Sequence, residues 1–344
     1  MSVTNNRIDY IDLAKGFCIL FVVFNHVCKI YGYSDSLLAI QGSFRMPLYF
    51  ILSGLFFKQY GGFRDFIRRK TNKLIVPFFF FYLFLSFLLP IAMDVVDGIS
   101  GGGNFSHITY RHIAGLALGW MKGRYFNDAT WFLVALFMTN VLFYTLSKVR
   151  TLVLQIFLSA MLGVIGCYLS LGHISLPFRI DTAFTVIPFF AFGYFMRKYT
   201  TVLFPNKHDK YNWLFVILLS LFFVIPYKLG LLSALKINAI YCNPLIFYIC
   251  GISGTMVVML VSKMLRSLPY ISYVGRYSIM VLVTHWAFLK CFHKYVGNVC
   301  SNPQMNVVLI FLITMFFCTI LIPLMKKCIP QFTAQEDLIK CNAK

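Results

Sequence analysis

The chain alternates long apolar stretches with short polar connections along its whole length. Most stretches are long enough to cross a bilayer, whose hydrocarbon core of about 30 Å needs about 20 residues of α-helix. The pattern predicts an all-α, polytopic membrane protein with about ten transmembrane helices. The predicted spans are residues 12–32, 39–57, 75–95, 130–147, 152–171, 183–197, 212–229, 243–262, 269–290 and 305–325.

Composition supports the membrane class. Hydrophobic residues make up 59% of the 344 residues and charged residues only 12%, whereas soluble domains carry about 25% charged residues. Asp9, Asp12 and Lys15 interrupt the N-terminal apolar stretch, so we expect the first helix to be retained as a span rather than removed as a signal peptide. We expect one integral membrane domain over residues 1–344, without a soluble appendage.

The distribution of basic residues predicts the orientation. A net charge of +20 is compatible with nucleic-acid binding only if Lys and Arg form a soluble basic surface. Here Lys and Arg are instead concentrated on the connections that are cytoplasmic if the N-terminus is, as the positive-inside rule requires. We therefore expect both termini in the cytoplasm, contact with membrane lipids and no nucleic-acid partner.

The ten cysteines are scattered, mostly through apolar runs, and lack the paired spacing of metal ligands. Free cysteine is commonly a small buried hydrophobe, so we interpret these residues as part of the core. No bound metal is expected.

Ionisable residues inside the first span are the strongest functional signal. Charged and titratable groups are costly within a membrane and generally mark a site. Lys15 and His26 are separated by eleven residues, which places them about 16 Å apart along a helix and within about 20° of one face. The structural alternatives are that His26 bonds a neighbouring helix and that Lys15 pairs with Asp12.

The motifs around this span resemble those of a known family. The first stretch carries Arg7, Ile11-Asp12, Lys15-Gly16 and His26, followed by FRMPLYFILSGLFF at 44–57. Further motifs are RRKTNKLIVPF at 68–78, TWFLVALF at 130–137, IPFFAFGYFMRK at 187–198 and YISYVGRYSIMVLVTHWAFL at 270–289. In these stretches the chain resembles the acyltransferase-3 family of integral membrane acyltransferases.

The resemblance implies transfer of an acyl group, usually acetyl, from cytoplasmic acetyl-CoA to a sugar hydroxyl of a surface or secreted glycan. It also implies a location in the inner membrane of a bacterial cell. The family's signature of a basic residue and a histidine falls on Lys15 and His26, and its paired basic residues fall nearest Arg68 and Lys70. Lysine stands where the family often has arginine, which keeps the charge but removes bidentate geometry.

The residue chemistry is consistent with acyl transfer. Neutral imidazole is suited to accept a hydroxyl proton near neutral pH, so His26 is our candidate general base, with Asp12 as an orienting group. Arg45 could stabilise an oxyanion or lie among lipid headgroups. The second intramembrane histidine, His285, lines the same cavity or has a packing role.

The basic segment that precedes the third span is the candidate site for coenzyme A phosphates. Its cationic residues are Arg68, Arg69, Lys70 and Lys73. Topology alone also makes inner segments basic. Outer aromatic residues such as Trp120, Tyr125 and Trp131 belong to an aromatic belt or stack on sugar, and Asp128 or Asp181 could orient His26.

Two other function classes remain open at this level. A transporter or flippase of a glycan or glycolipid precursor would also use intramembrane charges and broken helices, and an internal repeat, which we do not find, would favour it. A non-catalytic membrane partner would leave Lys15 and His26 without a task.

Overall fold

The computed structural model describes residues 8–33, 36–85, 128–197, 211–232, 243–297 and 299–341, with Leu235, Asn238 and Ile240. These residues form helices and connections and include no β-strand. The main helices are α1 (Asp9–Ile30), α2 (Ser36–Leu55), α3 (Phe63–Lys70), α6 (Trp131–Leu146), α7 (Leu152–Leu171), α8 (Ile180–Met196), α10 (Asn212–Lys228), α11 (Pro244–Leu265), α12 (Pro269–Arg276), α13 (Ser278–Val296) and α14 (Pro303–Cys328). A π-helical turn at Thr71–Ile75 continues α3 into a helix that is described to residue 85.

Each predicted span overlaps a described helix. By length and composition, four helices among the described residues can cross a membrane, namely α1, α7, α11 and α14. The helices α6 and α10 are apolar but shorter, with 16 and 17 residues. The second half of the predicted span 75–95 lies outside the described residues.

The prediction of one helix over residues 269–290 was wrong. The chain forms two helices here, α12 and α13, which are separated at Tyr277, with φ −110° and ψ 27°. The Tyr277 ring lies beneath two cations, with Arg276 Cζ 5.6 Å and Lys326 Nζ 4.6 Å from the ring centroid. Lys326 also donates to the Tyr277 hydroxyl at 2.9 Å, so the break is held by contacts with α14.

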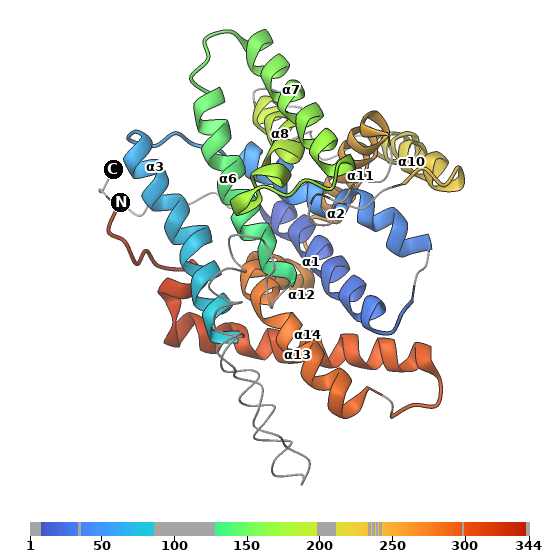
Figure 1. Cartoon of the computed structure of the whole chain (residues 1–344). Coiled ribbons are helices and arrows are strands. Elements are labelled where there is room, and N and C mark those ends of the chain that lie inside the picture. Colours follow the sequence, from blue (N-terminus) through green and yellow to red (C-terminus); the bar gives the residue numbers. More distant parts are fainter. Residues whose placement is uncertain are drawn as a thin grey trace.

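Helix α1 lies at the centre of the bundle and packs against α2, α11, α12, α13 and α14 (Figure 1). The helices α7 and α10 lie at the edge, beside α8 and α11 respectively. Large apolar side chains remain exposed on these outer helices; on α7, Val153 is 79% and Tyr168 76% exposed. An apolar outer surface of this kind is suited to lipid.

Two crossings between helices depend on glycine. A Cβ on Gly16 would overlap the backbone oxygen of Ile271, and one on Gly275 would overlap the backbone oxygen of Asp12. A Cβ on Gly54 or Gly193 would likewise overlap the backbone of α8 or α2. Small residues let membrane helices approach closely, so the α1–α12 crossing brings the neighbours of its glycines, Lys15 and Arg276, to one place.

We predict that Gly275→Ala destabilises the protein, because a methyl group there has to displace backbone rather than a flexible side chain. Overpacking of this kind costs about 1–3 kcal/mol. The measurement is the midpoint of thermal unfolding in detergent. Gly172→Ala is the control, because its new Cβ would meet its nearest atom, on the Ile174 side chain, at 3.4 Å. Equal midpoints for the two variants would contradict the close crossing.

Candidate functional site

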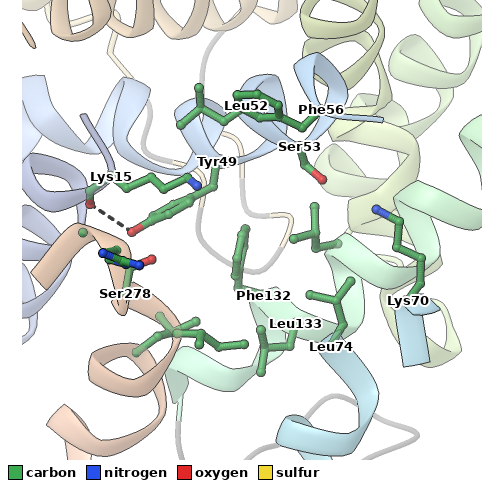
Figure 2. Close-up of a pocket in the computed structure, with 15 residues that line it drawn as sticks. Lys15, Tyr49, Leu52, Ser53, Phe56, Lys70, Leu74, Phe132, Leu133 and Ser278 are labelled. Carbon is green, nitrogen blue, oxygen red and sulfur yellow. Dashed lines mark hydrogen bonds between the residues drawn. The ribbon is translucent and has the colours of Figure 1, made fainter. Parts of the chain in front are cut away.

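A cavity of about 280 Å³ lies between α1, α2, α6, α13 and the helix that begins with α3 (Figure 2). Three cationic residues line it: Lys15 from α1, Lys70 from α3 and Arg276 from the end of α12. Figure 2 shows Lys15 and Lys70 on opposite sides of the cavity. Leu52, Leu74, Phe132 and Leu133 supply apolar wall between them. We call this space the cationic cavity.

Tyr49 fixes the α1 side of the cationic cavity. Its hydroxyl donates to the backbone oxygen of Lys15 at 3.2 Å (Figure 2), which ties α2 to α1. The Lys15 ammonium lies 6.0 Å from the centroid of the Phe56 ring, a separation at which a cation is attracted by an aromatic face.

Lys70 is the last residue of α3, directly before the π-helical turn. Its ammonium lies 5.7 Å from the centroid of the Phe66 ring, and Phe66 is fully buried. Burial lowers the pKa of Lys70 to about 8, because removal from water disfavours the charged amine. Leu74 belongs to the π-helical turn Thr71–Ile75 that follows Lys70, and both residues line the cavity.

The other predicted phosphate-binding residues do not line the cationic cavity. Arg68 is exposed. Arg69 pairs with Asp65 at 2.9 Å, and this hydrogen bond lowers the pKa of the Asp65 carboxyl. Lys73 donates to the backbone oxygen of Ala334 at 2.7 Å and lies 3.6 Å from Asp337.

The C-terminal segment holds Lys73 in this position. The Asn72 side chain donates to the backbone oxygen of Ile339 at 2.8 Å and accepts from its backbone N–H at 2.9 Å. The Phe332 ring stacks on Phe80 with centroids 4.2 Å apart. The C-terminal residues therefore bind Asn72 and Lys73 of the basic segment, whereas Lys70 lines the cavity.

A second, smaller cavity of about 60 Å³ contains His26. Asn25, Lys29, Arg45 and Trp131 are among the residues that line it with His26. Leu282 lines both this space and the cationic cavity, and no other residue of the described chain does. We call the smaller space the histidine cavity.

Residues of α13 form the wall beside His26. The ring centroids of His26 and His285 are 5.3 Å apart, and those of His26 and Trp286 are 4.8 Å apart. His285 is fully buried, and its Nδ1 donates to the backbone oxygen of Val281 at 2.8 Å. Among the described residues its Nε2 has no hydrogen-bond partner, so in this tautomer the Nε2 lone pair remains available.

Arg45 is held rigidly at the same cavity. It is only 9% exposed, and its Nη1 donates to Gln41 Oε1 at 3.0 Å, one turn earlier on α2. The Cys18 thiol donates to the backbone oxygen of Arg45 at 2.6 Å. These contacts hold Arg45 at the cavity that His26 also lines, where its charge can stabilise a developing anion.

Several acids and aromatic residues lie elsewhere. Asp12 is buried, but it lines neither cavity. Asp181 lies 3.8 Å from Arg179 and does not line the histidine cavity. The candidate residues Arg7, Trp120 and Tyr125 and the Asp128 side chain lie outside the described part of the chain. Within that part no group of His, Cys, Asp and Glu could hold a metal ion.

Comparison with known families supports the resemblance that the sequence motifs indicate. The acyltransferase-3 family model, described as "Acyltransferase domain", matches residues 8–323. The chain belongs to the acyltransferase-3 family. Searches of curated proteins and of solved structures each found no match. Together, the family and the apolar helices identify a membrane acyltransferase.

Five of the motif stretches, all except 187–198, supply residues that line the two cavities. Lys15 and His26 of α1 lie on different cavities, Lys15 on the cationic one and His26 on the histidine one. Sequence reasoning missed Arg276 and Leu282, which belong to the motif at 270–289 but were assigned to the interior of a predicted span. In both Lys15-Gly16 and Gly275-Arg276 a cationic residue stands next to a glycine. This shared pattern was the available sequence signal for Arg276.

We predict that stability rises between pH 7 and pH 9 through Lys70. The folded-state pKa of about 8 lies below the ordinary value of 10.5, so over this range the unfolded chain holds a proton that the folded chain has released. One pKa unit corresponds to about 1.36 kcal/mol, and partial exposure reduces the gain to about 1 kcal/mol. The thermal midpoint should therefore rise more in the wild type than in Lys70→Gln. Identical pH profiles would contradict the burial of this amine.

Proposed function

We propose that the chain is an O-acyltransferase that moves an acyl group, in the simplest case acetyl, from cytoplasmic acyl-CoA to a sugar hydroxyl of a surface or secreted polysaccharide. The observation that carries the proposal is the meeting of a cationic cavity and a histidine cavity at one side chain, Leu282. Acyl-CoA carries anionic phosphates at one end and a reactive thioester at the end of its long pantetheine arm. The cationic cavity suits the anionic part, and the histidine cavity suits the thioester.

The cationic cavity is the proposed donor site. With both termini in the cytoplasm, Lys15, Lys70 and Arg276 face the side from which acyl-CoA arrives. Cationic side chains bind phosphate through charge-assisted hydrogen bonds. The volume of about 280 Å³ is at the lower limit of ligand pockets, which hold about 300–1,000 Å³. We therefore assign the pantetheine arm to this cavity and the nucleotide to its mouth.

The proposed reaction takes place at the histidine cavity. The sugar hydroxyl oxygen attacks the thioester carbonyl carbon while His26 accepts the hydroxyl proton. Arg45 stabilises the oxyanion of the tetrahedral intermediate. The carbon–sulfur bond then breaks, the acyl group stays on the sugar, and the CoA thiolate leaves and takes the proton back from His26.

His285 and Trp286 are proposed to position the His26 ring. The Nε2 lone pair of His285 favours a protonated nitrogen on the facing ring, and Trp286 packs at its edge. We assign Asp12 a structural role near the α1–α12 crossing.

We predict that His26→Gln abolishes acylation, with a loss of at least about 100-fold, the contribution typical of a general base. The measurement is mass spectrometry of surface polysaccharide from cells that carry the wild type, the variant or no copy of the gene. The added acyl mass should be present only with the wild type. His173→Asn is the matched control, because His173 is exposed in a turn with φ 53°, which Asn also tolerates. An unchanged polysaccharide in the gene-deleted cells would refute the proposed activity and favour a transporter.

We also predict that two basic neighbours differ in donor binding. Lys70→Gln should weaken coenzyme A binding to the purified protein about tenfold, in a salt-sensitive manner, because Lys70 faces the cationic cavity. Arg68→Gln removes the same charge from an exposed position and should change the affinity less than twofold. Equal losses would show that only the overall charge of the segment matters.

A further inference from the structure

We infer that Leu282 is the specificity-determining residue for the size of the acyl group, an inference that rests on the proposed function. Leu282 lines both cavities and is 5% exposed. A thioester that enters through the cationic cavity meets this side chain before it meets the His26 ring.

The position of Leu282 on α13 directs it toward the reacting groups. Trp286 follows four residues later, so the two side chains share one face of the helix, and the Trp286 ring contacts the His26 ring. On α6, Trp131 lines the histidine cavity and Phe132 lines the cationic cavity. Two adjacent residues of α6 therefore also lie at the boundary between the two cavities.

The space beyond Leu282 is small. Its volume is about 60 Å³, compared with about 280 Å³ for the cationic cavity. That space is suited to the methyl group of an acetyl thioester whose carbonyl carbon lies at His26. A butanoyl group carries two further carbons, which have no place unless Leu282 moves.

Substitution of Leu282 tests the inference through the ratio of butanoyl transfer to acetyl transfer. Leu282→Ala removes three carbon atoms, more than the two by which butanoyl exceeds acetyl. We expect the ratio of butanoyl to acetyl transfer to rise at least tenfold, since one methylene in a hydrophobic pocket changes selectivity by about 10–200-fold. Both thioesters compete in one preparation, so the ratio does not depend on the fraction of protein that is folded.

The reaction mixture contains the purified full-length chain, acetyl-CoA and butanoyl-CoA together, and surface polysaccharide from cells that lack the gene. Mass spectrometry gives the two products. Leu282→Val, which removes one carbon atom, should give a smaller rise and serves if the Ala variant fails to fold. Ile279→Ala is the control, because Ile279 lies one turn earlier on α13 and lines the cationic cavity alone, so its ratio should stay within twofold of the wild type.

The outcomes separate this inference from the proposed function. If the wild type transfers acetyl and the ratio is unchanged in Leu282→Ala and Leu282→Val, the role of Leu282 is refuted and the acyltransferase stands. If no thioester is consumed, the relative affinities of acetyl-CoA and butanoyl-CoA, measured without acceptor, still test Leu282, whereas the proposed reaction fails. Binding of neither thioester by the wild type refutes both.

Discussion

The contact between the backbones of α1 and α12 is the constraint on which the site depends. Neither Gly16 nor Gly275 can carry a side chain, because the carbonyl oxygens of Ile271 and Asp12 occupy the space. The crossing places Lys15 beside Arg276 at the cationic cavity. It also fixes where α13 starts, so that this helix runs past α1 and its residues His285 and Trp286 meet His26. One close approach between helices, which small residues permit in membranes, thus aligns both cavities.

The structure keeps its intramembrane charges inside the bundle. A cation within the hydrocarbon region is costly unless it has partners or lines a cavity. Lys15 lies over an aromatic ring at a cavity wall, and Arg45 is bonded to Gln41 within its own helix. The outer helices instead carry exposed apolar residues. Under the proposed function, the two cavities are where a hydrophilic donor and acceptor are admitted.

The sequence predicted the helices well because hydrophobic runs are local. The bounds of α7 agree with the prediction residue for residue, and Lys15, His26 and Arg45 all line a cavity. The break at Tyr277 escaped prediction because no proline marks it and the polar stretch GRYS at 275–278 is short and lies between apolar runs; contacts with Lys326 of α14 hold it. Which basic residue faces the cavity was also out of reach. Lys73 is engaged by Ala334 and Asp337, and such long-range contacts have no local pattern.

The apolar side chain of Leu282, which lies between the two cavities, has a chemical consequence for the proposed reaction. A thioester is also open to attack by water, so an enzyme that transfers its acyl group to a sugar has to limit water at the carbonyl carbon. Leu282 separates a space with three cationic residues from one with an imidazole, and neither space is large. If the acyl group displaces water as it passes Leu282, the carbonyl reaches His26 in a nearly dry environment, where the charge of Arg45 acts more strongly than it would in water. The same side chain that limits acyl size would then also disfavour hydrolysis, which links the selectivity of the enzyme to its efficiency.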